Sequence, residues 1–174
     1  TLGRRSFLGP ASLQAAAQGT LLSIDSPRLP GRPLLGFSHV DSVTQTGGRF
    51  GHGGATAWVD VSALDWVFDC HFQDDPVVPG TLMVDALLQL AGLYAAIAGF
   101  QGAGRATRID GVRFLREVTP ECSRVEYRMD VRRLHRGSGL VLASGEAWVG
   151  GNRCMAAERL TVCIIPRGTA DVAE

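Results

Sequence analysis

Hydrophobic and polar residues alternate along the second half of the chain in the pattern of half-buried strands. In RVEYRMDVRRL (residues 124–134), every second residue from Val125 to Val131 is apolar and the residues between them are charged. That period of two is typical of a strand with one face in water. Two further strand-like segments follow, GLVLASGEAWVG and RCMAAERLTVCII, separated by a turn at residues 150–152. The pattern predicts an antiparallel meander.

Two strand-like segments also lie in the first half of the chain. LLGFSHVDSV (residues 34–43) is the first, and the second follows a glycine-rich turn and contains Trp58 and Val61. A phosphate-binding loop would lead its glycines into the N-terminus of a helix. The glycines from Gly47 to Gly54 lead into a strand-like segment instead, so they indicate a turn.

Between the two sets of strands, one helix is predicted from Gly80 or Thr81 to about Phe100. Its sequence is apolar on every face, which is typical of a membrane span or of the centre of a core. Asp85 and Gln89 share one face, and no basic anchors flank the segment. The strands on both sides need a covering element. We therefore expect an α+β fold, with an antiparallel sheet wrapped around one long buried helix, and no membrane span.

The N-terminal part is expected to hold a short helix and a connector. SLQAAAQ (residues 12–18) is rich in helix formers, and Ser12 can cap it. SPRLPGRP (residues 26–33) contains three prolines and a glycine, which predicts an extended connector. The sequence shows no linker long enough to divide residues 1–174, so one domain is expected, with residues 1–33 as its N-terminal helix and connector.

Composition narrows the classes of function. The 174 residues contain 17 basic and 17 acidic side chains, so neither a nucleic-acid nor an anionic-membrane partner is indicated. The four cysteines lie far apart without a C-x-x-C pair, which argues against a zinc site and favours free thiols in a reducing compartment such as the cytoplasm. The first thirty residues lack a continuous apolar stretch, so no signal peptide is expected.

The segment CHFQDDPVVPGTLMVDALLQLAG (residues 70–92) places chemically useful residues at the start of the predicted helix. It contains His71-Phe72, Asp75-Pro76, Pro79-Gly80 and Asp85 in this order. In this order they resemble the active-site region of the β-hydroxyacyl-acyl-carrier-protein dehydratases, and most of all the β-hydroxydecanoyl dehydratase/isomerase branch. Residues 29–30, residues 44–50 and VEYRMDVRRL are also similar to their family counterparts.

The resemblance implies a fold, an activity and partners. Members of that family have a hotdog fold, and they dehydrate 3-hydroxyacyl thioesters carried on the phosphopantetheine arm of acyl carrier protein. They act as homodimers in which the histidine of one subunit faces the acid of the other, so His71 and Asp85 would meet across a subunit boundary. The resemblance implies an acyl tunnel and no metal or redox cofactor.

The residues themselves suit that chemistry. Dehydration needs a base for the proton on carbon 2 and an acid for the hydroxyl on carbon 3. His71 is the candidate base, because imidazole titrates near neutral pH. Asp85 is the candidate acid, because burial in an apolar helix disfavours its carboxylate more than the helix N-terminus favours it. The unpaired N–H groups of Gly80 and Thr81 can hold the thioester carbonyl, and Gly80 is expected to let the substrate approach closely.

Five further residues are predicted to line the tunnel or support the site. They are Phe72, Val77, Pro79, Met83 and Gln89. Pro79 sets the entry into the helix, and Gln89 is expected to hydrogen-bond to Asp85 one turn away. The dehydratase/isomerase branch has glycine at the position of Met83, so Met83 puts the isomerisation of trans-2 to cis-3 product in question.

Several other polar residues are expected to have no catalytic role. Asp74 and Asp75 are interpreted as turn residues before a proline. His39, His52 and His135 are expected to be structural, and they offer too few ligands for a metal site. Cys70 adjoins His71, but neighbouring side chains of an extended chain point in opposite directions, which argues against a thiol nucleophile.

Two other functions stay open at this stage. A hotdog thioesterase would hydrolyse the thioester with water activated by a carboxylate and would not need His71. A hotdog protein without activity would only bind acyl thioesters. The pathway also stays open between fatty-acid synthesis and the synthesis of polyketides or polyunsaturated lipids.

Overall fold

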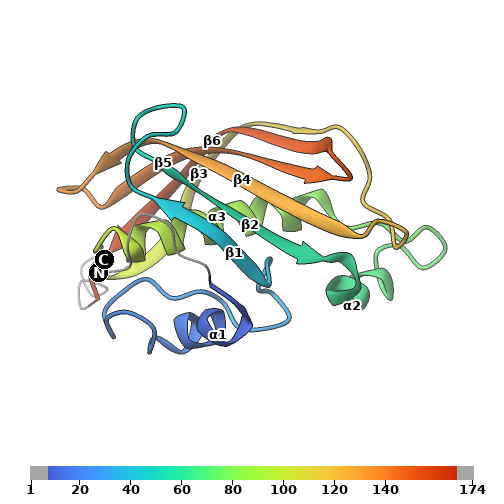
Figure 1. Cartoon of the computed structure of the whole chain (residues 1–174), viewed down its shortest axis with the longest axis horizontal. Helices are drawn as coiled ribbons and strands as arrows, with labels where there is room; N and C mark the ends of the chain where they lie inside the picture. Colours follow the sequence, from blue (N-terminus) through green and yellow to red (C-terminus); the bar gives the residue numbers. More distant parts are fainter. Residues whose placement is uncertain (1–7, 168–174) are drawn as a thin grey trace, which may run out of the picture.

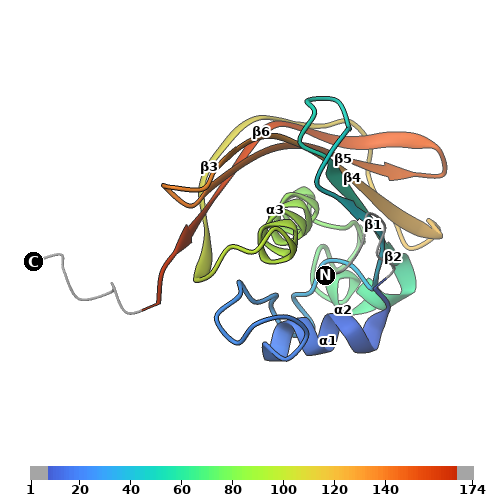
Figure 2. The same ribbon diagram turned by 60° about the vertical axis from the view of Figure 1, so that its left-hand side comes forward.

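A six-stranded antiparallel sheet curves around one long helix in the computed structural model, which describes residues 8–167 (Figures 1 and 2). The spatial order of the strands is β1-β2-β4-β5-β6-β3. Their bounds are β1 His39–Thr44, β2 Gly54–Asp60, β3 Ala103–Phe114, β4 Arg124–His135, β5 Leu140–Val149 and β6 Asn152–Ile165. The meander of β4, β5 and β6 confirms the prediction from the alternating pattern.

The helices are α1 Pro10–Gln18, the 3₁₀ turn η1 Val61–Leu64, α2 Asp65–Phe68 and α3 Gly80–Ile97. α3 lies in the concave side of the sheet (Figure 2). The apolar residues of β4 face it, and Val125 and Val131 are fully buried. α3 is long and apolar enough to cross a membrane, but most of it is buried beneath the sheet, so it is the core helix of a sheet-and-helix domain.

The N-terminal helix differs in detail from the expectation. It begins at Pro10 rather than Ser12, and its N-cap is Gly9 without a side-chain cap. Proline is well placed at the first helical position, because its nitrogen has no hydrogen to leave unpaired. Ser12 therefore lies inside the helix, and the expected Ser12 cap was wrong. Residues 26–33 form no helix or strand, as the prolines predicted, whereas the strand expected from residue 34 begins only at His39.

β3 was not predicted, and its surroundings explain why. It pairs with β6 along one edge and forms the end of the sheet, and none of its residues is buried. The burial pattern that makes a strand visible in a sequence is therefore missing. Gly104 and Gly111 weaken the signal further. The short segment of η1 and α2 was also not recognised, and Val61, which was expected in a strand, is the first residue of η1.

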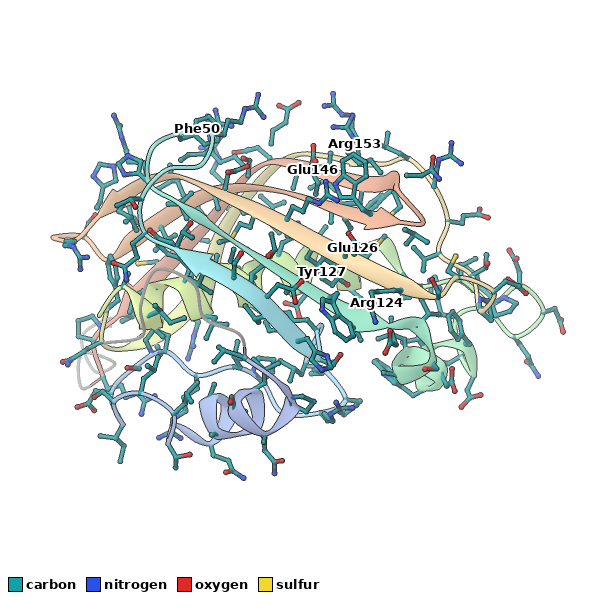
Figure 3. The ribbon with its side chains drawn as sticks, in the orientation of Figure 1. Phe50, Arg124, Glu126, Tyr127, Glu146 and Arg153 are labelled. Atoms are coloured by element: carbon teal, nitrogen blue, oxygen red, sulfur yellow. The ribbon has the colours of Figure 1, made fainter. Side chains whose placement is uncertain are left out.

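The outer face of the sheet is solvated and carries paired polar groups (Figure 3). Trp58 lies between the ring of His39, with ring centroids 3.8 Å apart, and the guanidinium of Arg124, 3.6 Å from its ring. Glu146 accepts a hydrogen bond from Arg153 at 2.7 Å. His39 thus has a structural role, as expected.

One expectation about α3 was wrong. Asp85 is exposed in the single chain, although the residues beside it, Val84 and Ala86, are buried. Thr81 is exposed on the same face, one turn earlier. The sheet covers α3 from one side only, so the face of Asp85 stays open. The chain's own core does not supply the burial that was expected to keep Asp85 protonated.

Candidate functional site

His71 is held in one orientation by the loop that joins α2 to α3. Its backbone N–H donates to the carbonyl of Val67 at 2.8 Å, and its own carbonyl accepts from Val77 at 2.9 Å. Its ring Nδ1 lies 2.9 Å from the carbonyl oxygen of Val77. A carbonyl only accepts, so the hydrogen of the neutral ring is on Nδ1. Nε2 then keeps its lone pair, which is the arrangement that a general base needs.

One face of the His71 ring is covered by Phe72, an exposed aromatic residue. Phe72 stacks on the imidazole with ring centroids 4.0 Å apart, and it is 56% exposed. Its backbone exchanges hydrogen bonds with Asp75, which closes a tight turn. Asp75 and Asp74 are exposed residues of this turn, as expected.

Cys70 is turned away from His71, although the reason given from the sequence was wrong. The chain at this point is a turn after α2 rather than an extended segment. The Cys70 thiol lies 3.3 Å from the carbonyl of Val67, whereas the His71 ring faces Val77. The two side chains therefore do not form a thiol–imidazole pair.

The first turn of α3 presents unpaired N–H groups close to this loop. Pro79 is the N-cap, and no side chain caps the helix. Leu82 donates back to the carbonyl of Pro79 at 3.0 Å, but the N–H groups of Gly80 and Thr81 have no acceptor within residues 8–167. Such groups, aligned with the helix dipole, attract a developing negative charge on oxygen.

Phe114, at the end of β3, covers the start of α3. A Cβ atom built on Gly80 would overlap the ring of Phe114. Gly80 is therefore needed for the packing of Phe114, whereas it was expected to leave room for substrate. Phe114 is 54% exposed, so its ring shields the helix start from the solvent side. Phe114 was missed because β3 itself was missed.

The contact between Gly80 and Phe114 gives a stability prediction. We expect Gly80→Ala to lower the free energy of unfolding by about 1–3 kcal/mol through overpacking. In a Phe114→Ala background, the same change should be neutral or stabilising by up to about 1 kcal/mol, because alanine favours the helix. Urea unfolding of the four variants measures the coupling. Additive effects of the two substitutions would contradict the contact.

Asp85 is fixed by Gln89, as predicted. The amide nitrogen of Gln89 donates to Oδ2 of Asp85 at 2.6 Å and to the carbonyl of Leu34 at 2.8 Å. Its amide oxygen accepts from the N–H of Gly36 at 2.9 Å. Gln89 is buried and thus joins the catalytic candidate to the connector before β1. The role of residues 34–36 could not be read from the sequence, because they lie more than 50 positions from Gln89.

Asp85 opens into a groove on the uncovered face of α3. The groove has a volume of about 420 Å³ and extends between the connector, α3 and the start of β3. Its lining includes Arg28, Leu34, Leu88, Gly92 and Ala106. His71 is not part of this lining, and no hydrogen bond between described residues joins it to Asp85. The single chain therefore does not assemble the predicted pair.

Met83 is buried under the sheet rather than exposed in that groove. Its sulfur lies 3.8 Å from the thiol of Cys154, and it is 2% exposed. Burial raises the pKa of Cys154 to about 11, so this thiol is protonated at neutral pH. Met83 and Cys154 together fill the interior below the first turns of α3.

The remaining histidines have structural surroundings. The carbonyl of His52 accepts from Tyr94 at 2.7 Å, and His135 is exposed at the end of β4. Within residues 8–167, no group of three His, Cys, Asp or Glu side chains is arranged to hold a metal ion. The four cysteines are unpaired.

The sequence that forms this sheet, its central helix and the loop of His71 matches a known protein family. Residues 29–158 match the model of the FabA-like domain. The chain belongs to the FabA-like domain family. This match includes the loop of His71, all of α3 and all strands except the end of β6, and it confirms the predicted hotdog fold.

Solved structures of low sequence identity share this FabA-like fold. The dehydratase heterocomplex ApeI:P from Xenorhabdus doucetiae is 17% identical, with a TM-score of 0.62 over 80% of this chain and 89% of that chain. A mutant thioesterase from Pseudomonas aeruginosa is 19% identical, with a TM-score of 0.58 over 95% and 99%. A thioesterase from Haemophilus influenzae is 18% identical, with a TM-score of 0.55 over 95% and 96%. Both classes of enzyme therefore occur on this fold.

Proposed function

We propose that this FabA-like protein dehydrates 3-hydroxyacyl thioesters on acyl carrier protein to trans-2-enoyl thioesters. The observation that supports it most is the hydrogen bond from Nδ1 of His71 to the Val77 carbonyl, which leaves Nε2 as a base. A thioesterase that works through a carboxylate would have no use for a histidine held in this way. Within the family, the order of motifs resembles the β-hydroxydecanoyl branch.

The proposed reaction moves two protons. Nε2 of His71 takes the proton from carbon 2, and the electron pair of that C–H bond forms the double bond to carbon 3. The C3–O bond breaks as Asp85 donates a proton to the hydroxyl, which leaves as water. The N–H groups of Gly80 and Thr81 bind the thioester oxygen while charge builds on it. These steps take no metal or redox cofactor, and the phosphopantetheine arm delivers the substrate.

We propose further that the site is shared between two copies of the chain. Asp85 is exposed in the groove on α3, and β3 has one unpaired edge, with Ile109 exposed in the strand and Leu115 exposed just after its end. Pairing of two β3 edges about a two-fold axis would cover this edge. The partner would then bring its own His71 toward Asp85 and desolvate the carboxyl, as a proton donor requires.

Asp85→Asn tests the acid. We expect it to keep the fold, because the amide has the same shape, and to lower kcat by about 100-fold or more, because it gives no proton. Asp74→Asn is the matched control, since Asp74 is an exposed carboxylate of the nearby turn. Equal kcat values for the two variants would assign the acid to another residue.

One assay separates the candidate functions. The protein is incubated with 3-hydroxyacyl thioester on acyl carrier protein, and the enoyl product is followed by its absorbance while free thiol is titrated. Enoyl formation supports dehydration, and thiol release without it supports the thioesterase alternative. Adding trans-2-decenoyl substrate tests isomerisation. This activity is in question because Met83 stands where the dehydratase/isomerase branch has a glycine.

We place the reaction in the cytoplasm, in fatty-acid, polyketide or polyunsaturated-lipid synthesis.

A further inference from the structure

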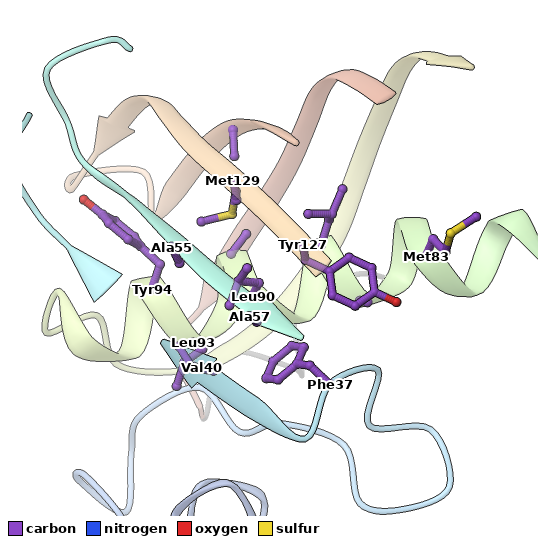
Figure 4. Close-up of a cluster of buried hydrophobic side chains, with 14 of the residues drawn as sticks. Phe37, Val40, Ala55, Ala57, Met83, Leu90, Leu93, Tyr94, Tyr127 and Met129 are labelled. Carbon is purple, nitrogen blue, oxygen red and sulfur yellow. The ribbon is translucent and has the colours of Figure 1, made fainter. Parts of the chain in front are cut away.

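Tyr127 extends from β4 toward α3 inside the buried cluster (Figure 4). Its side chain is 2% exposed. Its neighbours across the strands are Ala57 on β2 and Ala147 on β5. Because both neighbours are short, they leave room beside the phenol ring. The sequence showed Tyr127 only as one of the inward residues of a strand.

The hydroxyl of Tyr127 makes no hydrogen bond to any residue that the structure describes. Within residues 8–167, every side-chain oxygen or nitrogen that is wholly inaccessible has a hydrogen-bond partner. The small accessible part of Tyr127 therefore includes its hydroxyl oxygen. A buried hydroxyl lowers the stability of the fold unless an acceptor, such as a ligand atom, forms a hydrogen bond with it. The hydroxyl thus faces a space in which a polar atom can lie.

Tyr94 shows that a buried tyrosine of this core can be satisfied by the protein itself. It lies on α3, is fully buried, and donates its hydroxyl to the carbonyl of His52 at 2.7 Å. Burial raises the pKa of both tyrosines, so both remain donors at neutral pH. The two hydroxyls differ in that the one of Tyr127 has no acceptor among residues 8–167.

The surroundings of Tyr127 place it at the candidate site. Its cross-strand row continues through Ala147 of β5 to Met155 of β6, the residue after Cys154. Cys154 contacts Met83, which is one turn of α3 beyond Gly80. The Tyr127 ring therefore extends toward the part of α3 that carries Met83 (Figure 4), and the same first turns of the helix contain Gly80, Thr81 and Asp85.

We propose that the Tyr127 hydroxyl donates a hydrogen bond to an oxygen of the bound acyl thioester, which makes Tyr127 a substrate-binding residue. The inference rests on the proposed function for the identity of the ligand. The acceptor is an uncharged oxygen, either the thioester carbonyl or the 3-hydroxyl. In an apolar interior, one such bond orients an acyl group that otherwise has only dispersion contacts.

The test uses Tyr127→Phe in the full chain and two probes that resist hydrolysis. The probes are the pantetheine amides of a saturated acyl group and of its 3-hydroxy derivative, and calorimetry gives their dissociation constants. We expect Tyr127→Phe to weaken binding by about 3- to 10-fold, the effect of one neutral hydrogen bond. The melting temperature should not fall, because the lost hydroxyl has no hydrogen-bond partner among the described residues.

Tyr94→Phe is the matched control. It leaves the His52 carbonyl without a donor, so the melting temperature should fall by about 2–4 °C while affinity for both probes is unchanged. This opposite pattern separates a substrate contact from a structural hydroxyl.

The probes also decide which oxygen is bound. Weaker binding of both probes by Tyr127→Phe identifies the carbonyl, and weaker binding of the 3-hydroxy probe alone identifies the hydroxyl; either result supports the proposal. Unchanged affinity for both probes overturns it, as does a parent protein that binds neither. If the parent binds the probes through Tyr127 but forms no enoyl product, the proposed dehydration fails while this inference stands.

Discussion

Replacing His71 with alanine is expected to lower kcat for dehydration by about 10²- to 10⁴-fold, the usual contribution of a general base. The structure gives the reason, because the Val77 carbonyl accepts the hydrogen of Nδ1 and leaves the lone pair of the neutral ring on Nε2. The fold should persist, because His71 is only half-buried in a loop. Initial rates of enoyl formation, with saturating substrate, are the measurement.

His135→Ala is the control for the loss of an imidazole elsewhere. His135 is exposed at the end of β4, and its removal should leave kcat unchanged. If His71→Ala kept kcat within about tenfold of the parent, the base would have to be another group. If His71→Ala lost dehydration but released thiol at the parental rate, hydrolysis would be the better function.

Mixing two inactive variants is expected to restore activity if the site is shared. In a mixed dimer of His71→Ala and Asp85→Asn, one site has both groups intact and the other has neither. Random subunit exchange makes about half of the dimers mixed, so about a quarter of the parental activity should return. This follows from the exposure of Asp85, and from the groove around it, whose lining does not include His71 in the single chain.

The controls for this experiment concern exchange and assembly. Subunit exchange is verified with two chains that carry different tags, and each variant is mixed with itself as a blank. Verified exchange without recovered activity would mean that each chain completes its own site, and the shared-site proposal would be rejected. A protein that stays monomeric during turnover would reject it as well.

Much of the fold could be predicted because buried apolar residues recur along the chain at the spacing of the strand or helix that contains them. Val125 to Val131 alternate, and the strand β4 follows from that pattern. The apolar run after Pro79 is too long for a strand, so α3 was predicted nearly to its last residue. β3 lacks a buried face and has no such pattern, which is why it escaped prediction.

Some contacts of the candidate site could likewise be predicted from the sequence, and others could not. The spacing of Asp85 and Gln89 is a helical turn, so their hydrogen bond could be predicted from local geometry alone. The bond from His71 to Val77 depends on a loop conformation that no periodicity describes. Phe114 meets Gly80 from a strand more than 30 positions away, and such a contact is decided by how β3 packs on α3.

The sequence by itself determined the sheet-and-helix architecture, the location of the histidine loop and the hydrogen-bond partner of Asp85, because each depends on residues close together in the chain. Tertiary structure alone decided that Asp85 is exposed, that Phe114 covers the start of α3, and that the Tyr127 hydroxyl has no hydrogen-bond partner within residues 8–167. A helix that is apolar in composition can still have one face uncovered. Which face it is depends on where the sheet ends, and this is a property of the packed chain rather than of any segment in it.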